Sequence, residues 1–96
     1  MTLNERIYNA DQAKLVLDNE AFQQVFEDIK QEITEQWMQS PARDEAGRQS
    51  LWQMLKMLEK VRLCLQSSLD SGKLAAKELE YQNSLSKKVK EWAGMA

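Results

Sequence analysis

The side chains that could do chemistry in this chain fall into three groups: an acidic cluster, a single thiol and a lysine-rich tail. The acidic cluster consists of Glu27, Asp28, Glu32 and Glu35. Carboxylate oxygens are the ligands that divalent cations such as Mg²⁺ prefer, so this spacing could in principle serve a metal ion. Nothing around the cluster predicts the burial that tight binding or catalysis requires, so an ordinary solvated helix face is the favoured interpretation.

The thiol belongs to Cys64, the only cysteine, and the chain contains no histidine. Structural zinc sites and Cys–His nucleophiles therefore cannot form within one chain. The three glycines are isolated, so no glycine-rich phosphate loop is present. The sequence predicts a protein that is not an enzyme and that uses no cofactor or metal. Cys64 falls at the edge of an apolar arc, where we expect a buried small side chain rather than a reactive thiol.

The lysine-rich tail is part of an uneven charge distribution. Residues 1–45 carry four basic and ten acidic side chains, a net of −6, whereas residues 46–96 carry nine and five, a net of +4. Either the two halves face each other in the fold, or the tail contacts the phosphates of a nucleic acid. The tail lacks arginine and the whole chain is acidic, so nucleic-acid binding is the weaker interpretation. The lysines concerned are Lys73, Lys77, Lys87, Lys88 and Lys90.

Helices must position these groups, because residues of high helix propensity dominate the 96-residue chain and β-branched residues are scarce. A chain of this length forms one domain, taken as residues 1–96. It has no apolar run of the roughly 20 residues that a membrane-spanning helix needs, and no signal peptide is evident. Apolar spacing predicts helices over about 4–17, 20–39, 45–71 and 74–92, with a frayed end at 93–96.

Residues with specific backbone preferences mark the boundaries of these helices. Asn19 and Asp44 are good N-cap residues, and Pro41 disfavours helical backbone at Ser40. A bent continuous helix through Asn19 fits nearly as well as a turn there. At Gly72 the chain should bend or end its helix, because glycine tolerates the left-handed backbone of a helix C-terminus.

The third predicted helix has an unusually wide apolar face. Its apolar residues cover an arc of roughly 180°, whereas a stripe that faces one neighbouring helix covers roughly 100 to 120°. The outer segments or a second copy must cover the excess, and we expect a homo-oligomer. Trp37 continues the stripe of the preceding helix and is expected in the core. Trp52 lies off the arc and should cover the loop or lie in an interface. The residues expected at an interface are Trp52, Met54, Met57, Val61 and Cys64.

Two segments carry a resemblance to a known group of proteins. They are AKLVLDNEAFQQVFEDIKQEITEQW and RQSLWQMLKMLEKVRLCLQSSLDSGKLA, which together cover about residues 13–75. They resemble small helical proteins encoded in tailed bacteriophages and prophages, often near virion or head-assembly genes. The resemblance lies in the pattern of helix faces and caps. It implies a phage origin, a location in the cytoplasm of the bacterial host or in the virion, and other phage structural proteins as partners.

These observations predict an all-α domain in which the second and third helices form an antiparallel hairpin across residues 40–47. The outer segments are expected to pack onto this hairpin, so that a hairpin or small bundle results. The predicted function is that of a non-enzymatic phage structural or assembly protein acting through protein–protein contacts and self-association. The alternative is a small DNA-associated phage packaging or regulatory protein that uses the lysine-rich tail. No membrane contact is expected.

Overall fold

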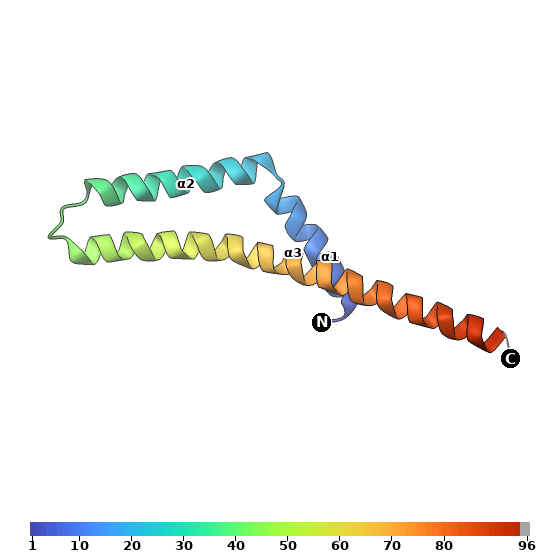
Figure 1. Ribbon diagram of the computed structural model, residues 1–96. Coiled ribbons are helices and arrows are strands. Elements are labelled where there is room, and N and C mark those ends of the chain that lie inside the picture. The colour runs from blue at the N-terminus through green and yellow to red at the C-terminus, as the bar shows by residue number, and fades with distance from the viewer. Residues whose placement is uncertain (95–96) are drawn as a thin grey trace.

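The computed structural model describes residues 1–94, which form helices α1 (Leu3–Leu17), α2 (Glu20–Gln39) and α3 (Glu45–Gly94) (Figure 1). The prediction of an all-α chain is confirmed. Helix α3 has 50 residues and includes both of the last two predicted helices, so it is about 75 Å long at 1.5 Å per residue. The predicted fraying is not found at residues 93–94, and residues 95–96 lie outside the described residues.

The predicted boundaries around α2 are confirmed. The Asn19 side-chain oxygen accepts a 2.9 Å hydrogen bond from the backbone N–H of Phe22, so α1 and α2 are separate helices. The Asp44 carboxylate accepts a 3.1 Å bond from the N–H of Gly47 and caps α3. Between them Ser40 is extended, with φ −68° and ψ 140°. These polar caps use short side chains to satisfy N–H groups that have no partner within the helix.

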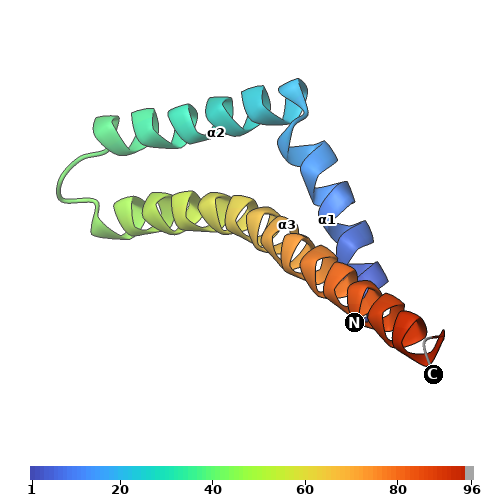
Figure 2. The same ribbon diagram turned by 45° about the vertical axis from the view of Figure 1, so that its right-hand side comes forward.

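The structure has no break in the helix at Gly72, where a bend or a break was predicted. Helix α3 passes through Gly72 without interruption and with no positive φ, curving gently along its length (Figure 2). A Cβ atom at this position would collide with the Cβ of Ala10 and would lie 3.0 Å from the carbonyl oxygen of Arg6. The glycine therefore permits the close approach of α1 rather than the end of a helix.

Helix α1 crosses α3 at this point, and small residues line the crossing. Ala10 is 5% exposed, Ala13 is 4% exposed and Ala75 is completely buried. The Arg6 side chain stabilises the crossing through two hydrogen bonds to Ser71. Its Nε donates to the Ser71 Oγ at 2.9 Å, and its Nη2 donates to the Ser71 carbonyl at 3.0 Å. Small side chains allow the two backbones to approach closely, so this contact is tight despite the small apolar area of each residue.

Helix α2 lies alongside the first half of α3, to which the turn after Ser40 joins it (Figures 1 and 2). Phe26 and Ile33 are its buried residues, at 9% and 6% exposure. At the turn, the Arg48 guanidinium lies 4.0 Å from the ring centroid of Trp37 and donates to the Trp37 carbonyl at 3.2 Å. Trp37 is 43% exposed, so its predicted place in the core is wrong: its ring packs against a cation at the surface.

The molecule is long and thin. Its radius of gyration is 22.1 Å and its extents are 80 × 26 × 16 Å, whereas a compact domain of this length has a radius of about 12.5 Å. Helix α1 packs on α3 as the prediction for the outer segments requires, but the last part of α3 does not fold back. Every residue from 80 to 94 is exposed, and this segment projects away from the other helices (Figure 1). We call residues 80–94 the C-terminal projection.

Candidate functional site

An open apolar groove runs between α2 and α3 on one side of their contact. Its apolar lining comes from both helices, and much of it faces solvent: Met57 is 64% exposed, Met54 53% and Val61 52%. We call this surface the apolar groove; its apolar lining residues are Ile29, Ile33, Met54, Met57, Leu58 and Val61.

The width of the apolar arc on α3 explains why the groove stays open. Leu58 is half-buried and faces α2, whereas Met57 precedes it by one residue and is therefore rotated by about 100° around the helix. One neighbouring helix covers only part of such an arc. The flank that carries Met54, Met57 and Val61 consequently remains uncovered.

A second apolar cleft lies on the opposite side of the same contact. Trp37 from α2 and Trp52 from α3 both line it, together with Leu51 and Leu55. Trp52 is 52% exposed, and the Lys56 ammonium lies 5.5 Å from the centroid of its ring. Both tryptophans therefore present a ring face to solvent and to a cation, which is a common arrangement at protein contact surfaces.

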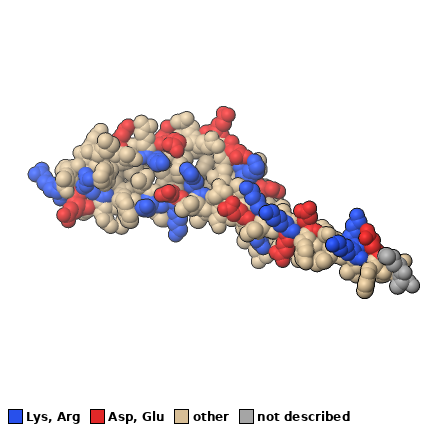
Figure 3. Space-filling model, viewed as in Figure 1, with Lys and Arg blue, Asp and Glu red and all other residues tan. Residues whose placement is uncertain are grey.

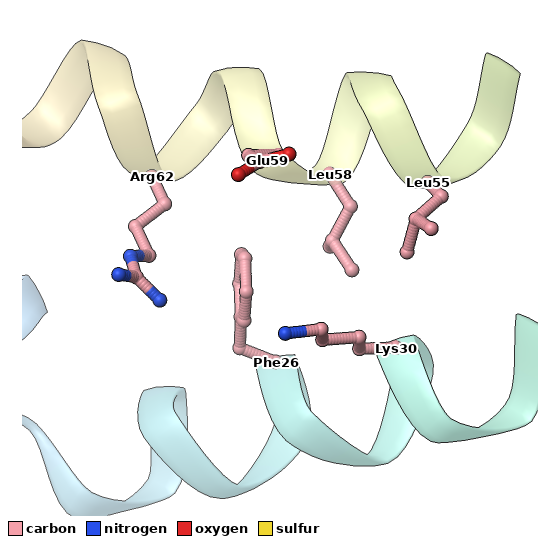
Figure 4. Close-up of a pocket in the computed structure, with 6 residues that line it drawn as sticks. All are labelled: Phe26, Lys30, Leu55, Leu58, Glu59 and Arg62. Atoms are coloured by element: carbon pink, nitrogen blue, oxygen red, sulfur yellow. The ribbon is translucent and has the colours of Figure 1, made fainter. Parts of the chain in front are cut away.

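Farther from the turn along the same helix pair, a small pocket brings charged side chains against an aromatic ring. Figure 4 shows the Phe26 ring projecting from α2 toward α3, where Leu58, Glu59 and Arg62 lie, and the Lys30 side chain running along α2 toward Phe26. Within residues 1–94 none of these charged groups makes a salt bridge. The pocket therefore combines apolar side chains with charged groups that no ion pair holds in place, which suits a contact surface better than a preorganised reaction site.

The structure divides the predicted interface residues between two surfaces. Met54, Met57 and Val61 come together in the apolar groove, whereas Trp52 belongs to the cleft on the other side. Cys64 lies one turn beyond Val61 and is exposed, so its predicted burial is wrong. Its position at the edge of the arc places it beyond the reach of α2.

The lysine-rich tail also lies in the open. All five predicted lysines are exposed, and Figure 3 shows basic and acidic side chains interleaved over the last part of α3. Among the described residues the single salt bridge joins Lys14, in the last turn of α1, to Asp18, the C-cap residue of that helix, at 2.6 Å. Within residues 1–94 no ion pair therefore links one helix to another, so the uneven charge of the two halves is not accompanied by direct ion pairs between them.

This local ion pair has an electrostatic consequence. The hydrogen bond from Lys14 to Asp18, together with the negative charge of that carboxylate, raises the pKa of Lys14 above its usual value of 10.5. Both side chains are exposed, so water screens the interaction and its contribution to stability is small.

The residues that sequence analysis missed are those of the α1–α3 crossing. Its small residues, Ala10 and Ala13 on α1 and Gly72 and Ala75 on α3, repeat at a spacing of three in each helix. Such spacing places small side chains on one helix face, which is the signal that could have revealed a close helix contact. Taken alone, Gly72 is a local signal that predicts a bend or an end of the helix.

The acidic cluster of α2 remains dispersed and exposed. In residues 1–94 no three potential metal ligands of the Asp, Glu, Cys or His type come together. None of the helices in the same residues combines the length and the apolar character that crossing a membrane requires.

The fold and these surfaces define an elongated all-α protein with two open apolar clefts and a projecting charged helix. No protein-family description, no curated protein and no solved structure matches the chain.

Proposed function

We propose that the protein is a non-enzymatic structural or assembly protein that acts through protein–protein contacts and self-association. The observation that carries this proposal is the surface left exposed by one chain, 7935 Å². A compact folded monomer of the same mass exposes about 5,700 Å². The excess of about 2,200 Å² is larger than the roughly 800 Å² that each partner buries in an interface of standard size.

The chemical character of this surface supports the same conclusion. Large apolar side chains are grouped in the apolar groove, where Ile29, Met54, Met57 and Val61 adjoin one another. Grouped apolar exposure of this kind marks contact sites, whereas isolated exposed apolar residues are normal. In this proposal α2 and α3 act as an antiparallel hairpin, and further chains complete a helical bundle around it.

The resemblance to phage proteins gives the proposal its biological setting. A structural or assembly role in a phage particle would require contacts with copies of the chain and with other phage structural proteins. The two open clefts on α2 and α3 could serve two such contacts at once, because they lie on opposite sides of one helix pair.

Light scattering and native mass measurement of the full chain test the proposal. We expect at least two chains per particle at micromolar concentration, because burial of the exposed apolar surface favours association. Increasing salt should leave this association unchanged or strengthen it. A wild-type chain that stays monomeric from the micromolar to the submillimolar range would contradict the proposal.

A weaker proposal assigns the protein to DNA-associated packaging or regulation through the lysine-rich tail. The observation in its favour is that these five lysines are exposed and form no salt bridge within residues 1–94. Phosphate contacts release counterions, so binding to duplex DNA should weaken steeply with salt. Gel-shift titrations of the wild-type chain at low and physiological salt decide this: absence of binding at low salt rules the function out.

A further inference from the structure

An open pocket lies beside the crossing of α1 and α3. Its volume is about 200 Å³, well above the roughly 10–15 Å³ that a single water molecule needs. Five of its six lining residues carry polar side chains, and no carboxylate lines it. We call it the serine pocket; its lining residues are Met1, Arg6, Asn9, Ser67, Ser68 and Ser71.

The positive charge in this pocket has no counter-charge within the chain. Arg6 is half-buried, and it makes no salt bridge within residues 1–94. Its hydrogen-bond partners in these residues are the hydroxyl and the carbonyl of Ser71, both of which are neutral. Removing a cation from water is costly unless an anion accompanies it, so arginines that are withdrawn from solvent are normally paired.

The geometry of the Arg6 hydrogen bonds leaves one edge of the guanidinium available. The two bonds to Ser71 use the N–H of Nε and one N–H of Nη2. The N–H groups of Nη1 and the second N–H of Nη2 donate to no group within residues 1–94. Two parallel donors on such an edge match two oxygens of one oxyanion.

The serines on α3 supply further donors from the other side of the pocket. The Ser71 Oγ accepts from Arg6, and the hydroxyls of Ser67, Ser68 and Ser71 donate to no described group. Serine and threonine hydroxyls in helices often donate to a backbone carbonyl one turn earlier, as Thr34 does to the Lys30 carbonyl at 2.8 Å. The serine hydroxyls therefore remain free to bind a ligand.

The number of donors favours one class of anion. A carboxylate or a phosphodiester has two charged oxygens, which the free edge of Arg6 alone would engage. Inorganic phosphate and a phosphomonoester present at least three free oxygens. The third oxygen could then accept from the hydroxyls on α3 while the other two lie against the guanidinium of α1.

We propose that the serine pocket binds the phosphate group of inorganic phosphate or of a phosphomonoester. Arg6 holds two of the phosphate oxygens, and the hydroxyls of Ser67 and Ser68 bind a third. The bound group links α1 to α3 and neutralises the charge of Arg6, so it stabilises the crossing. This site lies away from the two apolar clefts and does not depend on the proposed self-association.

Titration with inorganic phosphate, followed by nuclear magnetic resonance, tests the site in the full chain. Sodium chloride keeps the ionic strength constant. We expect saturable shifts of the Arg6 Nε–H signal and of the backbone N–H signals of Ser67 and Ser68, with a dissociation constant on the order of 1 mM. The melting temperature should rise with phosphate and not with chloride, because a ligand that binds only the folded chain stabilises it.

Matched serine variants test the hydroxyl contacts. The double variant Ser67→Ala, Ser68→Ala should raise the dissociation constant at least about fivefold, because it removes hydrogen bonds to a charged ligand. The control is Ser84→Ala, Ser86→Ala on the C-terminal projection, which should change it less than about twofold. Alanine has a higher helix propensity than serine, so both variants should keep the helical circular dichroism signal.

A third variant tests the guanidinium. Arg6→Lys keeps the charge and loses the paired donors, and we expect it to raise the dissociation constant at least about tenfold. The serine variants keep the test valid if Arg6→Lys disturbs the crossing, because they leave both bonds to Ser71 in place.

Two esters test the class of ligand, and the outcomes are distinct. Methyl phosphate should bind like inorganic phosphate, whereas dimethyl phosphate, with two free oxygens, should bind at least about tenfold more weakly. Equal binding of dimethyl phosphate would overturn the assigned class. Shifts that do not saturate by about 50 mM phosphate, or that persist unchanged in the Ser67→Ala, Ser68→Ala variant, would overturn the site. A monomeric wild type would contradict the proposed self-association and leave this site standing.

Discussion

The two contacts that α3 makes within the chain differ in how completely they close. At the α1 crossing, Ala75 is completely buried and Ala10 and Ala13 are at most 5% exposed. Along α2, the best buried side chains, Phe26 and Ile33, keep 9% and 6% of their surface. Small side chains let the helices of the first contact approach closely, whereas large side chains hold the second pair apart.

The difference shows that apolar content does not by itself close a contact. The α2–α3 region has many more large apolar residues than the crossing, yet Val25, Ile29, Met54 and Met57 stay exposed on its flanks. A crossing between small residues satisfies both helices within one chain. A wide arc of large residues needs more than one neighbour, and this is why the open region is the one proposed for intermolecular contact.

The largest expected effect on the free energy of unfolding comes from the contact between α2 and α3. Phe26→Ala removes the best packed ring between α2 and α3 and should lower the free energy of unfolding by about 3 kcal/mol. Met38→Ala on the same helix is the control, since Met38 is 72% exposed and should matter little. Urea unfolding followed by circular dichroism measures both. Equal effects of the two substitutions would show that packing of Phe26 against α3 does not stabilise the position of α2. The comparison of the two contacts would then lose its basis.

The crossing of α1 and α3 is tested by a substitution that raises or lowers stability depending on how closely the two helices pack. Alanine in place of glycine inside a helix normally stabilises by about 1 kcal/mol. At Gly72 the added Cβ would collide with Ala10, and overpacking of this kind costs about 1–3 kcal/mol. We therefore expect Gly72→Ala to lower the melting temperature. Gly94→Ala is the matched control, because a Cβ there meets nothing within 4 Å. A stabilised Gly72→Ala variant would mean that α1 does not lie this close to α3.

Local signals in the sequence were sufficient for the helix boundaries. Asn19 and Asp44 cap the helices that they were predicted to cap, because a cap depends on residues within one turn of itself. Gly72 shows the limit of this reasoning. Its local context resembles a helix end, but its role depends on Ala10, which lies 62 residues earlier in the chain. The spacing of small residues can indicate that a helix has a face suited to close contact, but local pattern does not specify which distant helix packs there.

The surfaces were predictable only in part, for a related reason. The arc of α3 correctly indicated that Met54, Met57 and Val61 share a face, since helical periodicity fixes this. The exposure of Cys64 and Trp37 depended on how far α2 reaches across α3, which periodicity does not specify.

The smallest expected effect on stability lies at the turn between α1 and α2. The pKa of Lys14 is raised by its hydrogen bond to Asp18, so the folded chain holds this proton more tightly than the unfolded chain does. The resulting stabilisation is fully present below pH 10.5, the usual pKa, and is lost as pH rises through the higher value in the folded state. Asp18→Asn removes the charge and most of this dependence while leaving the Asp18 backbone position, whose N–H bonds to the Lys14 carbonyl at 2.9 Å.

A titration of the Lys14 Nζ by nuclear magnetic resonance in the wild type and in Asp18→Asn measures the shift directly. We expect the wild-type pKa to lie above the variant value and the melting temperatures of the two proteins to be nearly equal below pH 9, because water screens exposed pairs of this kind. A melting temperature that falls as far as that of Gly72→Ala would show that the turn, and not the packing of small residues, keeps α1 against α3. The contrast between a closed crossing and an open helix pair would then have to be attributed to the connection between α1 and α2 instead of to side-chain size.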